Sequence, residues 1–335
     1  MIVTVVGSGS WGTAIAGQAA AHADEVRVWS FGGEAVEGIN TCHRNPIYLT
    51  DYVLPENVWA TDSFAEALEG TDGVILGVPS AFLRSVLEGA APHIAPDVPV
   101  LTLTKGIEQG TGYLMSELVE DCIGNADRIA VLAGPNHAEE VCRGSLSAAV
   151  IAAQDARVAE FFKSVLLSDH FRIYVGSDLV GVEMCSAVKN VIAIVCGYLA
   201  GMGYGDNTLA LVMTRGIAEI SRLVHARGGQ ALTCMGLAGM GDLVVTCTSH
   251  HSRNRTFGEA LANGGTLEEY QARTHMVVEG AQAAKSVAAL ARTLGVATPI
   301  TFALEAVLWR GVSKDAVFNE LIERFPTEEF YGMDD

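Results

Sequence analysis

The first half of the chain alternates short apolar runs with longer stretches rich in alanine and leucine. The apolar runs have the length and the β-branched residues of strands, and each ends at a residue suited to a turn. They occupy residues 2–6, 26–29, 73–78, 98–103 and 128–133. Since strands that alternate with helical stretches are typical of βαβ units, we predict a parallel sheet covered by helices over residues 1 to about 150.

Beyond residue 178 long helical patterns replace the strands. They cover residues 179–197, 208–226, 279–294 and 302–311. The longest apolar stretch, residues 191–204, is broken by glycines and falls short of the about 20 residues that span a bilayer, so we predict a buried helix and no membrane insertion. The fold class expected is α/β in two domains, residues 1–177 with the parallel sheet and residues 178–335 with helices alone.

The composition excludes several classes of partner. Half of the 335 residues are hydrophobic, and 21 Lys and Arg against 39 Asp and Glu give a formal net charge of −18, which repels nucleic acids and anionic membranes. The N-terminus lacks the pattern of a secretory signal, and the seven cysteines are scattered without a CxxC pair, so we expect a cytoplasmic protein with reduced thiols. His250 and His251 are adjacent and make no metal motif, and no metal is predicted.

A glycine loop follows the first predicted strand. Gly7, Gly9 and Gly12 form a GxGxxG motif between that strand and a helical run over residues 13–21. Glycines permit a tight turn and a close approach to a pyrophosphate, and the helix N-terminus supplies N–H donors for it. The loop therefore predicts a dinucleotide site.

The end of the second strand leaves the choice of dinucleotide open. An acid there favours NAD and an arginine favours NADP, but Ser30 and Phe31 stand in this place. Phe31 lies against the adenine or packs within the domain, and the sequence does not decide between them. We expect NADH and NADPH both to be used.

Three segments carry candidate chemistry for an anionic substrate. A loop lysine taken alone is more often an ordinary exposed one, but Lys105 directly follows a predicted buried strand and precedes a glycine, where ligands of open α/β sheets bind, so it is a candidate for an anionic substrate. Lys189 and Asn190 interrupt an apolar helix, so the lysine either snorkels to the surface or has a partner or task. A basic cluster at residues 249–255 precedes a helix over residues 256–262 and suits a phosphate. Three roles are open for Asp242: it holds a lysine, accepts from a substrate hydroxyl, or caps a helix.

Together these segments resemble the bacterial NAD(P)-dependent glycerol-3-phosphate dehydrogenases over nearly the whole chain. The matching segments are residues 7–14 (GSGSWGTA), 104–106 (TKG), 134–135 (GP), 187–193 (AVKNVIA), 237–243 (LAGMGDL), 252–255 (SRNR) and 278–280 (VEG). The resemblance implies a Rossmann domain followed by a helical domain similar to that of 6-phosphogluconate dehydrogenase. It also implies a cytoplasmic homodimer that interconverts dihydroxyacetone phosphate and sn-glycerol 3-phosphate with NAD(P)H and supplies glycerol 3-phosphate for phospholipid synthesis.

The resemblance also assigns residues by position. Lys189 matches the catalytic lysine of the family. The positions that match substrate-binding residues, together with Asn190 beside the lysine, are Lys105, Gly134, Asn136, Lys189, Asp242, Ser252, Arg253 and Asn254. The cofactor set, including the glycine loop and Phe31, is Gly7, Gly9, Ser10, Trp11, Gly12, Phe31, Lys105, Ala138, Arg253, Val277 and Glu279.

Four positions depart from the family pattern. Ser186 replaces a usual glycine, Val195 a small residue and Ala200 an acid, which leaves the packing of that helix and the substrate rim open. Phe31 stands where a basic or polar residue is more usual, which bears on cofactor preference.

The expected mechanism places Lys189 as the acid that protonates the developing alkoxide during hydride transfer. Lys105 and Asn190 orient the ketone, and Ser252, Arg253 and Asn254 anchor the phosphate. Another dehydrogenase of the same two-domain group, for a β-hydroxyacid or 6-phosphogluconate, is the nearest alternative. A non-catalytic nicotinamide sensor is an alternative of a different class.

Overall fold

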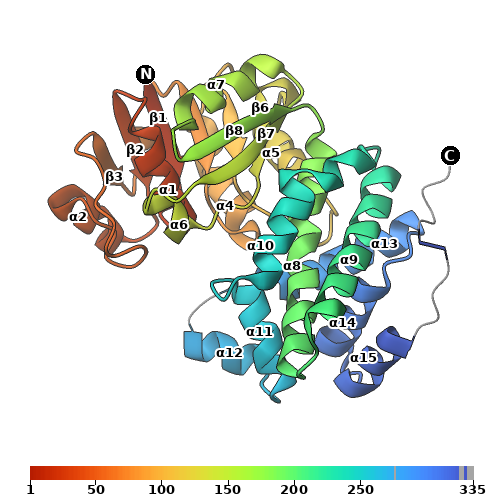
Figure 1. Cartoon of the computed structure of the whole chain (residues 1–335). Coiled ribbons are helices and arrows are strands. Elements are labelled where there is room, and N and C mark those ends of the chain that lie inside the picture. The colour runs from red at the N-terminus through yellow and green to blue at the C-terminus, as the bar shows by residue number, and fades with distance from the viewer. Residues whose placement is uncertain (275–276, 324–327, 330–335) are drawn as a thin grey trace. The chain divides into compact units, whose positions relative to one another are not determined.

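A computed structural model describes residues 1–274, 277–323 and 328–329 of the chain (Figure 1). The chain divides into two compact units: residues 1–105 with 113–179, and residues 106–112 with 180–335. The short segment 106–112 thus belongs to the second unit although its neighbours in sequence belong to the first. Compactness does not say what each unit binds, so the two functional domains, 1–177 and 178–335, stay a prediction.

The first unit is built on an eight-stranded sheet with the order β3-β2-β1-β4-β5-β6-β7-β8. Neighbouring strands are parallel except for β6 and β7, which are antiparallel. The strands are β1 Ile2–Val6, β2 Glu25–Trp29, β3 Val58–Thr61, β4 Gly73–Leu76, β5 Val100–Thr102, β6 Ile129–Ala133, β7 Ser147–Ala153 and β8 Phe171–Gly176. The first six strands follow the Rossmann order, in which the direction of strand addition reverses beside β1. This order confirms the predicted α/β class.

The sequence prediction missed three strands and the antiparallel pair. β3 has only four residues, and β7 consists of Ser, Ala and two β-branched residues, a composition that does not distinguish a strand from a helix. β8 alternates buried and exposed positions at the edge of the sheet, beyond the region in which strands were expected. The run of parallel strands therefore ends at β6, earlier than the sheet itself.

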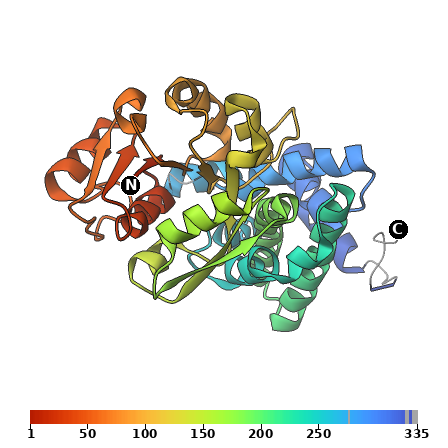
Figure 2. The same ribbon diagram turned by 90° about the horizontal axis from the view of Figure 1, so that it is seen from above.

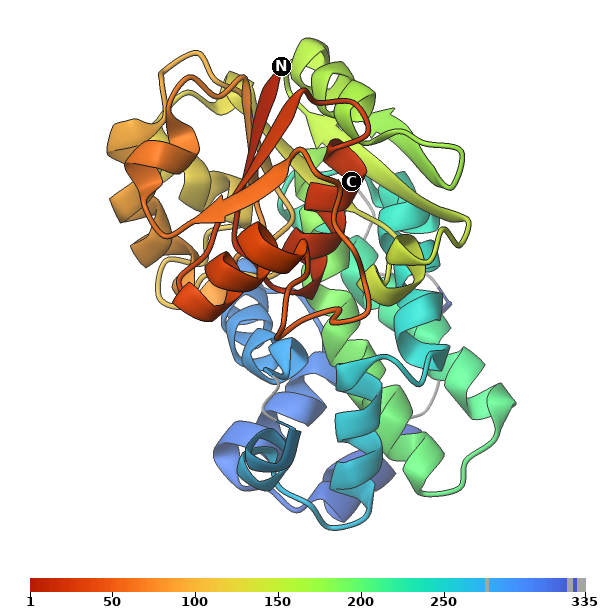
Figure 3. The same ribbon diagram turned by 90° about the vertical axis from the view of Figure 1, so that its left-hand side faces the viewer.

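Helices cover both faces of this sheet. The helices of the first unit are α1 Ser10–Ala19, α2 Gly33–Cys42, α3 Phe64–Leu68, α4 Ser80–Ala90, α5 Met115–Ile123, α6 Ala138–Cys142 and α7 Ala156–Leu166. One core cluster joins the sheet to α1, α2, α6 and α7, and the other joins it to α3, α4 and α5. Figures 2 and 3 show α3 and α4, in orange, and α7, in light green, on opposite sides of the sheet.

The described part of the second unit is helical. Its helices are α8 Leu179–Gly201, α9 Asp206–Ala226, α10 Asp242–Thr248, α11 Arg253–Ala262, α12 Leu267–Thr274, α13 Glu279–Leu294, α14 Pro299–Arg310 and α15 Lys314–Glu323. The helix predicted over residues 279–294 is found with the same bounds. α14 begins three residues before the predicted start, because Pro299 suits the first position of a helix, and ends before Gly311, whose φ is +67°.

The central helix of this unit is α8, which Figure 1 shows beside α9, α10 and α11. Its 23 residues are long and apolar enough to cross a membrane, so the argument that this stretch is too short was wrong. Every residue from 181 to 199 is nevertheless buried, which confirms the prediction of a buried helix. Ser186 donates to the carbonyls of Val182 and Glu183, and α8 continues unbroken past Val195 and Ala200, so these departures do not interrupt it.

Glycines let other helices approach α8 closely. A Cβ added to Gly258 of α11 would lie 2.1 Å from the carbonyl oxygen of Ile194, and one added to Gly197 would lie 2.0 Å from that of Arg255. Real side chains do not tolerate such distances, so α8 and α11 meet backbone to backbone. This contact fixes the start of α11 against the half of α8 that follows Lys189.

Candidate active site

The glycine loop forms a tight turn between β1 and α1. Gly7 has a φ of +113°, and an added Cβ there would lie 2.7 Å from the carbonyl oxygen of Gly77, just after β4. A Cβ on Gly12 would lie 2.0 Å from the carbonyl oxygen of Gly7, because α1 begins at Ser10, earlier than predicted, and brings Gly12 into its first turn. Nothing lies within 4 Å of a Cβ on Gly9. The loop is thus closed toward the sheet and open over Gly9, as a backbone that receives a pyrophosphate requires.

Two polar residues brace the loop from outside the motif. The hydroxyls of Ser8 and Ser30 are 2.7 Å apart, which ties the loop to the end of β2. Asn45 is fully buried and donates to the carbonyl oxygen of Ser8 at 2.7 Å and to the hydroxyl of Thr13 at 2.9 Å. The sequence analysis missed Asn45, since nothing in its local pattern distinguishes it from a turn residue.

Phe31 is 93% exposed, directly after β2. It therefore does not pack within its unit, and that interpretation of Phe31 was wrong. An exposed ring at this strand end fits the other interpretation of Phe31, a contact with the adenine of a dinucleotide.

The remaining predicted residues of the first unit follow the carboxyl ends of parallel strands. Lys105 comes after β5 and is half-buried, Gly134 comes directly after β6, and Asn136 and Ala138 come next and are buried. Because β1, β2, β5 and β6 are parallel, these positions and the glycine loop share one edge of the sheet.

Two buried donors at this edge have no acceptor among the residues that the structure describes. They are Nε1 of Trp11 and Nδ2 of Asn136. Buried polar groups are nearly always paired, so orphaned donors are features that a bound ligand would explain. The open space over Gly9 and these donors fit the dinucleotide and substrate predicted here.

In the second unit, Lys189 lies buried against a carboxylate and a hydroxyl. Its Nζ donates to Oδ1 of Asp242 at 2.5 Å and to Oγ1 of Thr246 at 2.7 Å, and the lysine and aspartate side chains are only 6% and 2% exposed. The lysine does not snorkel to the surface, and Asp242 holds it. The sequence analysis did not place Thr246 in the site, although Asp242 and Thr246 stand four residues apart on α10 and therefore share a face.

Asp242 follows a π-helical turn, Leu237–Gly241, and begins α10. Single π-helical turns occur often at functional sites because they redirect one side chain relative to the regular helix. Here the turn directs Asp242 toward α8.

The amide of Asn190 lies next to this cluster and connects α8 to α13. Its Nδ2 is 3.4 Å from Oε2 of Glu279, and Oδ1 of Asn254 accepts from the N–H of Gly280 at 2.9 Å. A Cβ on Gly280 would lie 2.5 Å from the carbonyl oxygen of Asn190, so only glycine fits there. The structure thus brings Asn190, Asn254 and Glu279 together around the start of α13. Val277, two residues earlier, is 41% exposed.

The predicted phosphate-binding residues form the first turn of α11. Ser252 is buried and caps the helix by accepting from the N–H of Arg255. Arg253 follows it and is exposed. A capped helix start followed by an exposed guanidinium suits a phosphate.

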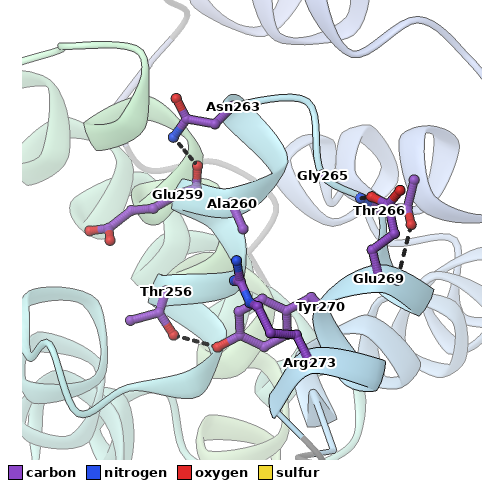
Figure 4. Close-up of a pocket in the computed structure, with 9 residues that line it drawn as sticks. All are labelled: Thr256, Glu259, Ala260, Asn263, Gly265, Thr266, Glu269, Tyr270 and Arg273. Atoms are coloured by element: carbon purple, nitrogen blue, oxygen red, sulfur yellow. Dashed lines mark hydrogen bonds between the residues drawn. The ribbon is translucent and has the colours of Figure 1, made fainter.

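A cavity of about 500 Å³ lies between α11 and α12 (Figure 4). The Tyr270 hydroxyl is 2.6 Å from that of Thr256 and also reaches the carbonyl oxygen of Arg253 at 3.4 Å. The residues that line the cavity are Thr256, Glu259, Ala260, Asn263, Gly265, Thr266, Glu269, Tyr270 and Arg273. It contains none of the predicted site residues, so we assign it no part in the reaction.

These features define a class of protein. A Rossmann-type sheet with an open glycine loop, and a helical unit with a buried lysine held by a carboxylate, are the parts of a two-domain nicotinamide dinucleotide dehydrogenase. Among the described residues, no three His, Cys, Asp or Glu side chains gather in a way that would hold a metal ion.

Comparison with known proteins gives the family. A model of the NAD-dependent glycerol-3-phosphate dehydrogenase N-terminus matches residues 2–159, and a model of the C-terminus of the same family matches residues 178–319. The chain belongs to the NAD-dependent glycerol-3-phosphate dehydrogenase family.

Curated relatives and solved structures agree with this assignment. The chain is 46% identical to glycerol-3-phosphate dehydrogenase [NAD(P)+] of Corynebacterium aurimucosum over 96% of this chain and 98% of that one. It is 43% identical to the enzyme of the same name from Thermobifida fusca over 99% of both chains. The crystal structure of glycerol-3-phosphate dehydrogenase from Coxiella burnetii matches with a TM-score of 0.92 and 35% identity over 96% of this chain and 99% of that one. A ketopantoate reductase of Ralstonia eutropha, with 16% identity and a TM-score of 0.61 over 95% of this chain and all of that one, shares the fold alone.

Proposed function

We propose that the protein reduces dihydroxyacetone phosphate to sn-glycerol 3-phosphate with NAD(P)H, and catalyses the reverse reaction. The observation that carries the proposal is the contact of Lys189 with Asp242 and Thr246. Burying a lysine and a carboxylate away from water lowers the stability of the fold, and replacing such an ion pair by apolar residues is often neutral or stabilising. A buried ion pair at this place therefore favours a chemical task for it. The names of the relatives support the choice of substrate.

Lys189 is the proton donor in this proposal. Bound NAD(P)H supplies the hydride. As negative charge grows on the carbonyl oxygen, the Lys189 ammonium stabilises it and then transfers a proton to it, and in the reverse direction the neutral amine accepts that proton. Asp242 and Thr246 accept from the ammonium and hold it in place for this step.

Specificity for a phosphorylated ketone is assigned to the start of α11. Ser252, Arg253 and Asn254 bind the phosphate, which lies away from the reacting carbon, so that its binding energy positions the carbonyl. Lys105 and Asn190 orient the ketone. Gly134 and Asn136 complete the substrate site from the end of β6, and this role is supported by Nδ2 of Asn136, which has no acceptor among the described residues.

The first unit binds the nucleotide in this proposal. The glycine loop, Ser10 and Trp11 hold the pyrophosphate, and Phe31 contacts the adenine. The family pattern adds Lys105, Ala138, Arg253, Val277 and Glu279 to the cofactor site. Since the end of β2 carries neither an acid nor an arginine, we expect NADH and NADPH both to serve.

The setting of the activity follows from the family resemblance. We place the enzyme in the cytoplasm as a homodimer in which residues 1–177 bind the nucleotide and residues 178–335 the substrate. Its product supplies phospholipid synthesis. Molar mass in solution, measured by light scattering after size exclusion, tests the dimer.

The deciding experiment follows the absorbance of NADH and NADPH with dihydroxyacetone phosphate, with ketopantoate, 3-oxo acids and the oxidised form of 6-phosphogluconate as comparison substrates. The proposal expects dihydroxyacetone phosphate to give the highest kcat/KM. A higher value for another substrate would assign the chain to a different reaction. Nucleotide binding without turnover of any substrate would favour a sensor.

A further inference from the structure

Four of the seven cysteines form two facing pairs in the second unit. The sulfurs of Cys185 on α8 and Cys234 on the 3₁₀ turn Ala231–Met235 are 3.6 Å apart, and both residues are fully buried. Cys196 on α8 and Cys247 on α10 are also in contact, and this thiol–thiol hydrogen bond and burial raise the pKa of Cys247 well above its usual value. Each pair joins α8 to the segment that contains Asp242 and Thr246.

The first pair lies close in sequence to both members of the buried ion pair, Cys185 to Lys189 and Cys234 to Asp242. Cys185 precedes Lys189 by four residues on α8, so the two side chains share one face of the helix. On the opposite segment, a Cβ added to Gly239 would lie 2.1 Å from the carbonyl oxygen of Cys234. The 3₁₀ turn therefore packs directly against the π-helical turn that ends before Asp242.

The two pairs differ in how they become accessible. The residues flanking Cys234 point outward, with Leu232 78% and Met235 63% exposed, so a local opening of this short peripheral turn exposes the thiol. Cys196 and Cys247 are each 1% exposed on regular α-helices, and reaching them requires α8 and α10 to separate. A buried thiol of raised pKa is inert.

From this geometry we propose that Cys185 and Cys234 form an oxidation-sensitive thiol pair that regulates the reaction of Lys189, whereas Cys196 and Cys247 stay reduced. The regulatory part rests on the function proposed above. The oxidant is a small-molecule disulfide. The Cys234 thiolate attacks one of its sulfurs, giving a mixed disulfide and releasing one thiol. The Cys185 thiolate then attacks the sulfur of Cys234 and releases the second thiol. The protein loses two electrons and two protons, and the small disulfide gains them.

The new bond changes the site because a disulfide is shorter than the thiol contact. The sulfurs must approach from 3.6 Å to about 2.05 Å, which draws the 3₁₀ turn toward α8 and moves the π-helical turn with it. Asp242 then leaves its position against Lys189. We expect oxidation to lower kcat by about tenfold or more, the scale of a lost charge-assisted hydrogen bond, and to leave nucleotide binding unchanged.

The test treats the whole protein with oxidised glutathione, blocks free thiols in denaturant, and measures intact mass, cross-linked peptides, turnover and NADPH affinity. The expected result is a Cys185–Cys234 peptide, loss of two hydrogen atoms, and a fall in kcat that dithiothreitol reverses. Cys234→Ser should resist inactivation. Cys185→Ala should form no intramolecular cross-link and should stop at the mixed disulfide of Cys234 with glutathione. Cys196→Ala and Cys42→Ser, matched controls in the other pair and at an exposed thiol, should respond as the wild type does.

Each result decides one part of the proposal. No Cys185–Cys234 peptide, or a Cys196–Cys247 peptide in equal yield, would overturn the assignment of the pair. The cross-link with unchanged kcat would overturn its coupling to Lys189. Absence of turnover before oxidation would contradict the proposed function instead, and the peptide map would still decide whether the pair is oxidised.

Discussion

The buried pair of Lys189 and Asp242 shows at the level of single residues how chemistry shapes this chain. α8 is apolar almost throughout, and a methionine at position 189 would suit its surroundings better than an ammonium. The ammonium is tolerated because Asp242 and Thr246 satisfy two of its donors.

Replacing Arg253 tests the phosphate site. Arg253→Ala should raise KM for dihydroxyacetone phosphate, because a charge-assisted contact is typically worth about 1.5–3 kcal/mol, or roughly 10- to 150-fold. Unphosphorylated dihydroxyacetone should be affected much less. Arg310→Ala, which removes another exposed arginine of the helical unit, is the matched control. An equal rise in KM for both ketones in Arg253→Ala would show that Arg253 does not bind the phosphate.

The exposed Phe31 offers a place to change cofactor choice. Phe31→Arg adds a charge partner for the 2′-phosphate, so it should raise the ratio of kcat/KM for NADPH over NADH, and Phe31→Leu should leave that ratio near the wild-type value. Steady-state kinetics with both nucleotides measure the ratio. A wild-type preference beyond about 1000-fold, roughly 4 kcal/mol, would point to a determinant away from the end of β2.

At the scale of elements, the crossing of α8 and α11 depends on glycine. Gly258→Ala places a methyl group 2.1 Å from the carbonyl oxygen of Ile194 and must separate the helices, at a cost of about 1–3 kcal/mol. Urea denaturation measures the loss. Gly205→Ala, where nothing lies within 4 Å of the added Cβ, should change stability by less than about 0.5 kcal/mol. Similar midpoints for both variants would mean that the crossing tolerates a side chain.

The start of α14 is held by a buried carboxylate of α9. Glu219 is 1% exposed and accepts from the N–H groups of Ile300 and Thr301 and from the Thr301 hydroxyl. Burial raises the pKa of Glu219 to about 7, although these donors and Arg222 act in the opposite direction. Its contribution to stability is thus fully present below its ordinary pKa near 4.5 and is lost as the pH rises to about 7.

Glu219→Gln should remove this pH dependence. The unfolding free energy of the variant relative to the wild type should rise between about pH 5 and pH 7.5, by on the order of 3 kcal/mol if the whole shift is expressed. Urea denaturation at a series of pH values measures the difference. Parallel curves for the two proteins would show that Glu219 does not titrate in this range.

At the scale of the whole molecule, local sequence patterns predicted five of the eight strands of the sheet, the glycine loop and the long helices. Periodicity and turn residues carry that information within a few residues. The contact between Lys189 and Asp242 spans 53 residues, and no local pattern encodes such a pairing, so three roles for Asp242 stayed open. The antiparallel β6–β7 pair and the facing thiols likewise depend on packing between distant segments.

The central claim is that the first unit binds the nucleotide while Lys189 of the second supplies the proton. Its most direct test is kcat for dihydroxyacetone phosphate in the double variant Lys189→Met with Asp242→Asn. Replacing both residues avoids leaving one buried charge unpaired, which would cost about 3–5 kcal/mol of stability. The account predicts that kcat falls by about 100-fold or more while the NADPH Kd and the thermal midpoint stay near the wild-type values. Turnover near the wild-type rate in this folded variant would contradict it.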